Sequence, residues 1–324
     1  MTRRRVLDAV ALVAGAIGLG FVVRELGWAG MIDAIATAGA WFAVIAVIDV
    51  GSLACDAFAI HAFLRGRAPV SYARVFAAEA SGLAINRLTP GNTLGEPVKV
   101  AMLSHGIAVE HAISAIVMFN LTTMFVGIAV IVTGVPLTAL LVGLPDKAAV
   151  AVWVATAALV AFSIAVVILV RRGALASVVD AAARVRVIGA ARAARWRAAV
   201  AQVDDSVRQF GGLRRGLAGV AVSRALNMCG SVLVLRAVGV ALTPSLVIAA
   251  LSVGAMVTSV ANVVPLGLGI ADGANYVLYG LLGATEHVGL LVTTVTRVRT
   301  CVLAALGLVI YAIASAIGGK PRRA

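Results

Sequence analysis

Long apolar blocks recur along the chain and are separated by short polar segments. A helix needs about 20 apolar residues to cross a hydrocarbon core about 30 Å thick. The blocks that approach or exceed this length are residues 6–23, 39–63, 112–134, 148–170, 216–238 and 288–317. None alternates apolar and polar positions as a lipid-facing barrel strand would. The pattern therefore predicts an all-α fold, a polytopic transmembrane helical bundle.

Composition supports this prediction and explains the positive charge. Hydrophobic residues make up 62% of the chain and charged residues 13%, far from the balance of a soluble domain. Basic residues cluster at both ends of the chain: Arg3, Arg4, Arg5, Lys320, Arg322 and Arg323. Basic segments normally stay inside, so we expect both termini in the cytoplasm of a bacterium and the protein in its inner membrane. The net charge of +13 is thus a topology signal, and no nucleic-acid partner is expected.

Residues 171–215 are rich in arginine and separate two apolar halves of the chain, residues 1–170 and 216–324. We expect this segment to be a cytoplasmic link between them. Within it, apolar side chains recur at steps of four and three and mark one face of a helix. They are Trp196, Val200, Val203, Val207 and Phe210. This link either lies along the cytoplasmic leaflet with its arginines near anionic lipid, or forms a solvated hairpin.

The stretch "NRLTPGNTLGEPVKV", residues 86–100, interrupts the first half. Helices are predicted over 74–88 and 97–110, each too short to cross a bilayer. Pro90 disfavours helix at the preceding residue, whereas Pro97 suits the first turn of a new one. We expect a hairpin over 74–110 that enters from the cytoplasm and turns back at mid-depth, with its tip lining a cavity.

A second interruption, "NVVPLGLGIADGANY", covers residues 262–276. Its Asn, Pro, Gly and acidic residues follow the order found in the first interruption. Matching breaks in two halves point to a transporter's binding site. If 245–262 and 270–284 form a hairpin from outside, six full spans remain and the halves are inverted copies. If both pieces of 245–284 cross instead, there are eight spans.

Charged residues near these breaks predict a phosphate site. The positive end of the helix at Pro97, with Arg87 and Lys99, suits the phosphate of a lipid. Glu96 either caps that helix and pairs with a nearby base, or binds a cationic group or a proton. The predicted substrate-binding residues are Asn86, Arg87, Thr89, Pro90, Gly95, Glu96, Lys99, Asn262, Pro265, Gly269, Asp272, Arg297 and Arg299.

The remaining intramembrane charges have two interpretations each. Arg297 and Arg299 point in different directions on a helix, so we expect Arg297 to face the cavity and Arg299 to snorkel; if the span begins nearer 300, both are interfacial. Asp272 is expected to cap a helix that opens at 273, or to be the counterpart of Glu96 in the second half. Asp49 and Asp56, seven residues apart, either relay protons or make hydrogen bonds across the bundle.

The two interruptions also carry a resemblance. "NRLTPGNTLGEPVKVAMLSHG" resembles the Asn-x-x-x-Pro and Gly-Glu element of the lysylphosphatidylglycerol synthase transmembrane regions, a family of flippase-like integral membrane proteins. "VVPLGLGIADGANYVLYGLLG" is similar to the later Pro- and Gly-rich element of that family. The resemblance implies movement of a phospholipid or lipid-linked headgroup between leaflets.

Catalysis is not expected in this chain. The three cysteines lack metal-ligand spacing, and no nucleotide or nucleophile motif occurs, so we expect no metal, no cofactor and no catalytic residue. The link is also shorter than a typical soluble domain. A membrane-embedded transferase of lipid headgroups and a non-transporting scaffold for lipid biosynthesis are the alternative functions.

Overall fold

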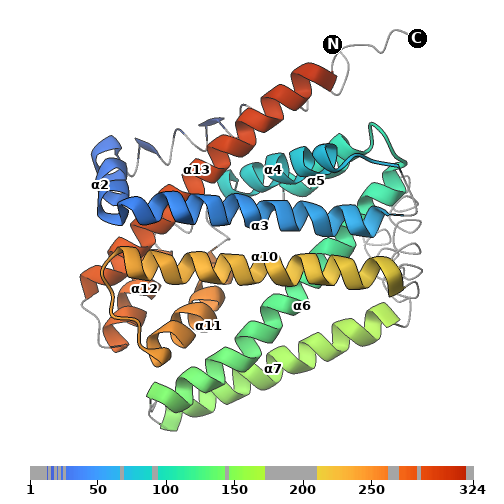
Figure 1. Cartoon of the computed structure of the whole chain (residues 1–324). Helices are drawn as coiled ribbons and strands as arrows, with labels where there is room; N and C mark the ends of the chain where they lie inside the picture. Colours follow the sequence, from blue (N-terminus) through green and yellow to red (C-terminus); the bar gives the residue numbers. More distant parts are fainter. Residues whose placement is uncertain are drawn as a thin grey trace, which may run out of the picture. The chain divides into compact units, whose positions relative to one another are not determined.

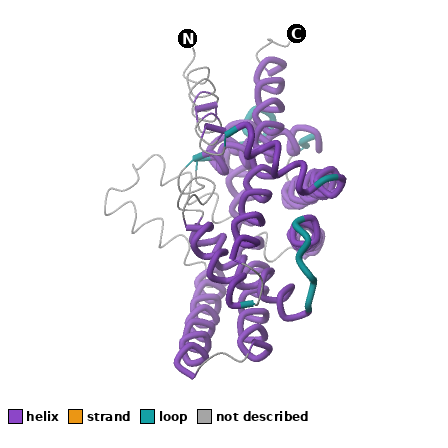
Figure 2. Tube along the Cα trace, turned by 90° about the vertical axis from the view of Figure 1, so that its left-hand side faces the viewer, coloured by secondary structure: helices purple, strands orange, loops and turns teal. Residues whose placement is uncertain are grey.

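The computed structural model describes Val13, Ala16, Ile17, Gly20, Val23 and Arg24, and then residues 27–65, 69–89, 94–142, 146–171, 210–261, 270–282 and 286–318. Regular structure in these ranges is entirely α-helical (Figure 2), which confirms the all-α prediction for them. Most of the predicted span 6–23 and the link between 172 and 209 lie outside the described residues.

Long helices coincide with the other predicted spans (Figure 1). They are α3 (Ala40–Leu64), α6 (Val109–Val142), α7 (Asp146–Arg171), α10 (Phe210–Ala237) and α13 (Glu286–Gly318). Four stretches in the described ranges are long and apolar enough to cross a membrane: Ala40–Leu64, Val109–Leu141, Leu213–Ala237 and Val288–Ala316. The protein is therefore a multi-pass helical membrane protein.

Among the described residues, four shorter helices flank the two interruptions, and a fifth, α2 (Trp28–Ala38), lies before α3. The four are α4 (Tyr72–Leu88), α5 (Gly95–Leu103), α11 (Pro244–Ala261) and α12 (Ile270–Leu281). At 1.5 Å per residue, α4 is about 26 Å long and α5 about 14 Å. Both are shorter than the hydrocarbon core, as the sequence predicts.

The predicted helix over 97–110 was too long. Helix α5 ends at Leu103, and a turn leads to α6. Ser104 Oγ donates to the Ala101 carbonyl at 2.8 Å, and His105 Nδ1 lies 3.2 Å from the Met102 carbonyl. Such local side-chain bonds compete with helical continuation, and Gly106 is a poor helix former.

Contacts divide the chain into two compact units. The first contains Met1–Ala54, Phe76–Lys99 and Ala225–Ala324, and the second contains Cys55–Val75 and Val100–Arg224. The first unit has an apolar core drawn from six helices, with Ala34, Ile45, Leu235, Leu246, Tyr279 and Val295 buried in it. The predicted division at 171–215 and the inverted relation of the halves remain predictions.

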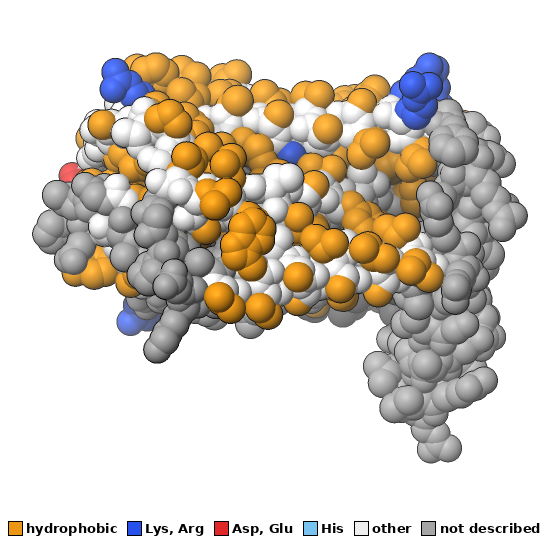
Figure 3. Space-filling view, turned by 90° about the horizontal axis from the view of Figure 1, so that it is seen from below, with side chains coloured by type: hydrophobic (Ala, Val, Ile, Leu, Met, Phe, Trp, Pro, Cys, Tyr) orange, Lys and Arg blue, Asp and Glu red, His pale blue; other side chains and the backbone are white. Residues whose placement is uncertain are grey.

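In the second unit, α7 runs beside α6 (Figure 1). Trp153, Phe162 and Ile164 are exposed on α7. Hydrophobic side chains also dominate the described surface in Figure 3, and charged ones are few there. An apolar surface of this extent is suited to lipid, because soluble proteins rarely expose contiguous apolar patches of more than a few hundred Å².

Candidate functional site

The first site lies where α4 ends and α5 begins. Helix α4 ends at Leu88, and Thr89 follows with its hydroxyl donating to the Ile85 carbonyl at 2.7 Å. This bond satisfies one of the carbonyls left open in the last helical turn. Residues 90–93, Pro90 among them, lie outside the described part of the chain. Helix α5 begins at Gly95, which places Pro97 in its first turn as predicted.

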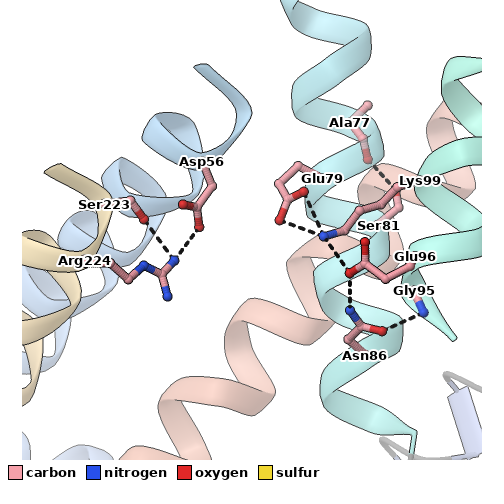
Figure 4. Close-up of polar contacts among 10 residues, drawn as sticks. All are labelled: Asp56, Ala77, Glu79, Ser81, Asn86, Gly95, Glu96, Lys99, Ser223 and Arg224. Atoms are coloured by element: carbon pink, nitrogen blue, oxygen red, sulfur yellow. Dashed lines mark hydrogen bonds and ion pairs between the residues drawn. The ribbon is translucent and has the colours of Figure 1, made fainter. Parts of the chain in front are cut away.

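Asn86 joins the two helices through both ends of its amide (Figure 4). The Gly95 backbone N–H donates to Asn86 Oδ1 at 2.6 Å, and Asn86 Nδ2 donates to Glu96 Oε1 at 3.0 Å. The first N–H group of α5 is therefore already engaged. The phosphate contact predicted at the start of the helix, at Pro97, remains a prediction.

Lys99 lies between two carboxylates in the same unit (Figure 4). Its Nζ is 2.9 Å from Glu79 Oε2, 3.1 Å from Glu79 Oε1 and 3.2 Å from Glu96 Oε1. The Lys99 and Glu79 side chains are 3% and 2% exposed, whereas Glu96 is 26% exposed. Glu96 thus pairs with a nearby base, as one of its two predicted interpretations has it, and Glu79 is a partner of Lys99 that the sequence interpretation missed.

Two glycines allow this close arrangement. A Cβ added at Gly82 would overlap the methylene chain of Lys99, and one added at Gly95 would overlap the Gly82 carbonyl oxygen. Helices α4 and α5 therefore touch through backbone, and Lys99 runs along α4 to reach Glu79. We call Glu79, Asn86, Glu96 and Lys99 the hairpin cluster.

The hairpin cluster changes what the predicted basic residues can do. Two unit charges about 3 Å apart attract by about 5 kcal/mol at an effective dielectric constant of about 20. Lys99 is held by such pairs, so a phosphate reaches it only if the pairs exchange. Arg87 is half-buried in the last turn of α4, and its contact with a phosphate remains a prediction.

Arg297 and Arg299 of α13 each bind an aspartate. Arg297 Nη2 donates to Asp272 Oδ2 at 2.6 Å, and Arg297 is 8% exposed. Arg299 donates to both oxygens of Asp49, from Nε to Oδ2 at 2.6 Å and from Nη2 to Oδ1. Residues two apart on a helix point about 200° apart, which explains their different partners.

Two expectations for this region are wrong. Arg299 does not snorkel, because its side chain is only 10% exposed and forms a two-bond fork with Asp49. Asp272 does not precede a helix at 273, because α12 already begins at Ile270 and Asp272 lies in its first turn. Asn262, Pro265 and Gly269 lie outside the described residues, so their predicted binding role is untouched.

The predicted proton-relay residues both meet arginines. Asp49 binds Arg299 as described above, which corresponds to the alternative of a hydrogen bond across the bundle. Asp56 Oδ2 accepts from Arg224 Nη2 at 2.8 Å in the second unit (Figure 4). Proton relay itself remains a prediction. Arg224 is a second partner that the sequence interpretation missed, although a lone arginine inside an apolar span marks such a site.

Apolar helices long enough to cross a membrane, with ion pairs buried among them, define an integral membrane protein built around intramembrane charge. The family model described as the lysylphosphatidylglycerol synthase TM region matches residues 6–307, and the chain belongs to this family. The resemblance found in the two interruptions is thereby confirmed. No curated protein and no solved structure matched the chain.

Proposed function

We propose that this protein moves an anionic phospholipid or lipid-linked headgroup between the leaflets of a bacterial inner membrane, with both of its termini in the cytoplasm. The family is named for the membrane region of a phospholipid-modifying synthase, which supports a lipid substrate. The observation that carries the proposal is the hairpin cluster, a set of buried charges at a break between two short helices. Buried charge of this kind marks substrate pathways in membrane proteins.

The proposed mechanism assigns different tasks to the charges. Arg87 and the positive end of the α5 dipole receive the phosphate. The pairs of Lys99 with Glu79 and Glu96 keep α5 against α4, and Glu96, the most exposed member, is the first to exchange when substrate enters. The acyl chains stay in lipid, and one half of the bundle rocks against the other to change access.

A transport assay tests this proposal. The purified chain is reconstituted into liposomes that contain fluorescent phosphatidylglycerol, and dithionite then bleaches the dye in the outer leaflet only. We expect bleaching to pass the one-leaflet plateau, and Arg87→Gln to slow that phase by about tenfold, equivalent to about 1.4 kcal/mol. Glu110→Gln, which removes an acid in the first turn of α6, is the matched control and should transport normally.

The assay also separates the rival functions. A scaffold predicts that bleaching stops at the plateau of empty liposomes, in which case the transport proposal is wrong. A transferase predicts that the lipid is chemically altered, which thin-layer chromatography of the same liposomes detects with a radiolabelled headgroup.

A further inference from the structure

The ion pair between Asp56 and Arg224 is only half made. Arg224 Nη2 donates to Asp56 Oδ2 at 2.8 Å and to Ser223 Oγ at 3.1 Å. Asp56 Oδ1 and Arg224 Nε are buried and have no hydrogen-bond partner among the described residues. These two atoms would complete a bidentate pair if they met. The pair therefore leaves one acceptor and one donor unsatisfied in an apolar setting, which is costly.

The other aspartate of α3 provides a direct comparison. Asp49 receives both N–H bonds of the fork from Arg299, and the two side chains are 2% and 10% exposed. The Asp56 side chain is also buried, at 7% exposed, but the Arg224 side chain is 28% exposed. The Asp49–Arg299 pair therefore makes both bonds of the fork and is buried. The Asp56–Arg224 pair makes one of the two bonds, and its arginine is partly exposed.

The position of Arg224 is unusual for a cation. It lies near the middle of the apolar stretch Leu213–Ala237, where an unpaired charge is expensive. Small residues bring α10 onto α3 here: a Cβ at Gly219 would lie 3.1 Å from Ala59 Cβ, and one at Gly216 would overlap the Phe63 ring. The close approach carries Asp56 to Arg224 but does not close the fork.

The surroundings of Asp56 are simple. Among the described residues, the charged group in contact with it is Arg224 of α10, with the Ser223 hydroxyl beside that guanidinium. On its own helix the titratable neighbour is the Cys55 thiol. His61, further along α3, lies 3.1 Å from the Val70 carbonyl instead.

We propose that Arg224 is a second phosphate-binding residue and that Asp56 is its exchangeable internal counter-ion. A phosphate group binds the Arg224 guanidinium in place of Asp56, because paired N–H groups suit a tetrahedral oxyanion. Asp56 is then left without its partner in an apolar setting, so it takes up one proton from water and becomes a neutral carboxylic acid. Phosphate binding and proton uptake are thereby coupled, one proton for each phosphate. This site goes beyond the transport proposal and does not rest on it.

Binding to the full chain in phosphatidylcholine nanodiscs tests the coupling. The probes are dihexanoylphosphatidylglycerol and dimethyl phosphate, since each keeps a single negative charge from about pH 5.5 to about pH 7.5. Calorimetry should show the affinity of the protein for these probes rising as pH falls, by up to about tenfold per pH unit. Binding of both probes indicates a site for any phosphate group, and binding of the lipid alone indicates a headgroup site. Binding of neither overturns the proposal, as does a pH-independent affinity.

Variants locate the effect. Asp56→Asn removes the competing charge and the proton acceptor, so it should bind at least about tenfold tighter at pH 7.5 and lose the pH dependence. A misfolded protein would not gain affinity, so this result is diagnostic. Arg224→Gln should abolish the pH-dependent binding, whereas Arg215→Gln, an exposed arginine on the same helix, should not. Asp33→Asn is the control for Asp56. Unchanged or weaker binding by Asp56→Asn would refute the exchange.

Discussion

Removal of the buried ammonium of Lys99 is the sharpest test of the hairpin cluster. The Glu79 and Lys99 side chains are 2% and 3% exposed, so Lys99→Met leaves a carboxylate enclosed without its counter-ion. Breaking a buried pair in this way costs about 3–5 kcal/mol of folding free energy. Replacing both members by neutral groups costs much less, because no isolated charge remains.

A double-mutant cycle measures this difference. Lys99→Met, Glu79→Gln and the double variant are unfolded by SDS in mixed micelles, and the free energies of unfolding are compared. We expect the double variant to lose at least about 2 kcal/mol less than the sum of the single losses. Arg215→Gln, on the exposed surface of α10, should stay within about 0.5 kcal/mol of the unchanged protein. Additive losses, or a Lys99→Met loss below about 1 kcal/mol, would refute the reasoning.

Further substitutions test the packing, the two aspartate pairs and the Asn86 amide by the same unfolding measurement. Gly95→Ala should destabilise by about 1–3 kcal/mol, because the added methyl overlaps the Gly82 carbonyl, whereas Gly127→Ala in α6, with open space beside it, should stabilise by up to about 1 kcal/mol. Asp49→Asn should cost about 3–5 kcal/mol and Asp56→Asn about 1–2 kcal/mol, since only the first breaks a complete fork; equal losses would contradict this distinction. Asn86→Asp should cost about 1–3 kcal/mol by turning a donor toward Glu96 into an acceptor, and adding Glu96→Gln should restore much of the loss.

Hydropathy was sufficient to predict most of the helices. The blocks at 39–63 and 288–317 differ from α3 and α13 by one or two residues at either end, because burial in lipid requires an unbroken apolar run. The block at 216–238 ends one residue after α10, which begins six residues earlier, at Phe210. The end of α4 at Leu88, shortly before Pro90, was also predictable, since proline disfavours helix at the residue before it. The end of α5 was not, because it depends on local bonds from Ser104 and His105.

The pairing of charges could not be predicted in the same way. Arg299 and Asp49 are 250 positions apart, and no local pattern indicates which acid meets which base. The hydropathy rule for intramembrane charge did apply to Glu79 and Arg224, which lie in the interiors of α4 and α10, away from the charged residues near the helix ends. It would have flagged both residues but not their partners. The two-sided use of the Asn86 amide depends on how closely Gly82 and Gly95 let the helices approach.

The central claim is that the break between α4 and α5 lies at membrane depth and faces water. A nitroxide on Leu94, the 53% exposed residue before α5, reports on this directly in a background without native cysteines. Labels at Val47, exposed on apolar α3, and at Ala108, exposed before α6, provide the lipid and surface references.

Power saturation of the electron paramagnetic resonance signal in liposomes then decides the claim. We expect the Leu94 label to lie about 10 Å or more below the headgroups and yet to be relaxed by a water-soluble nickel chelate. A label that behaves like Ala108, outside the membrane, or like Val47, relaxed by oxygen alone, would contradict it.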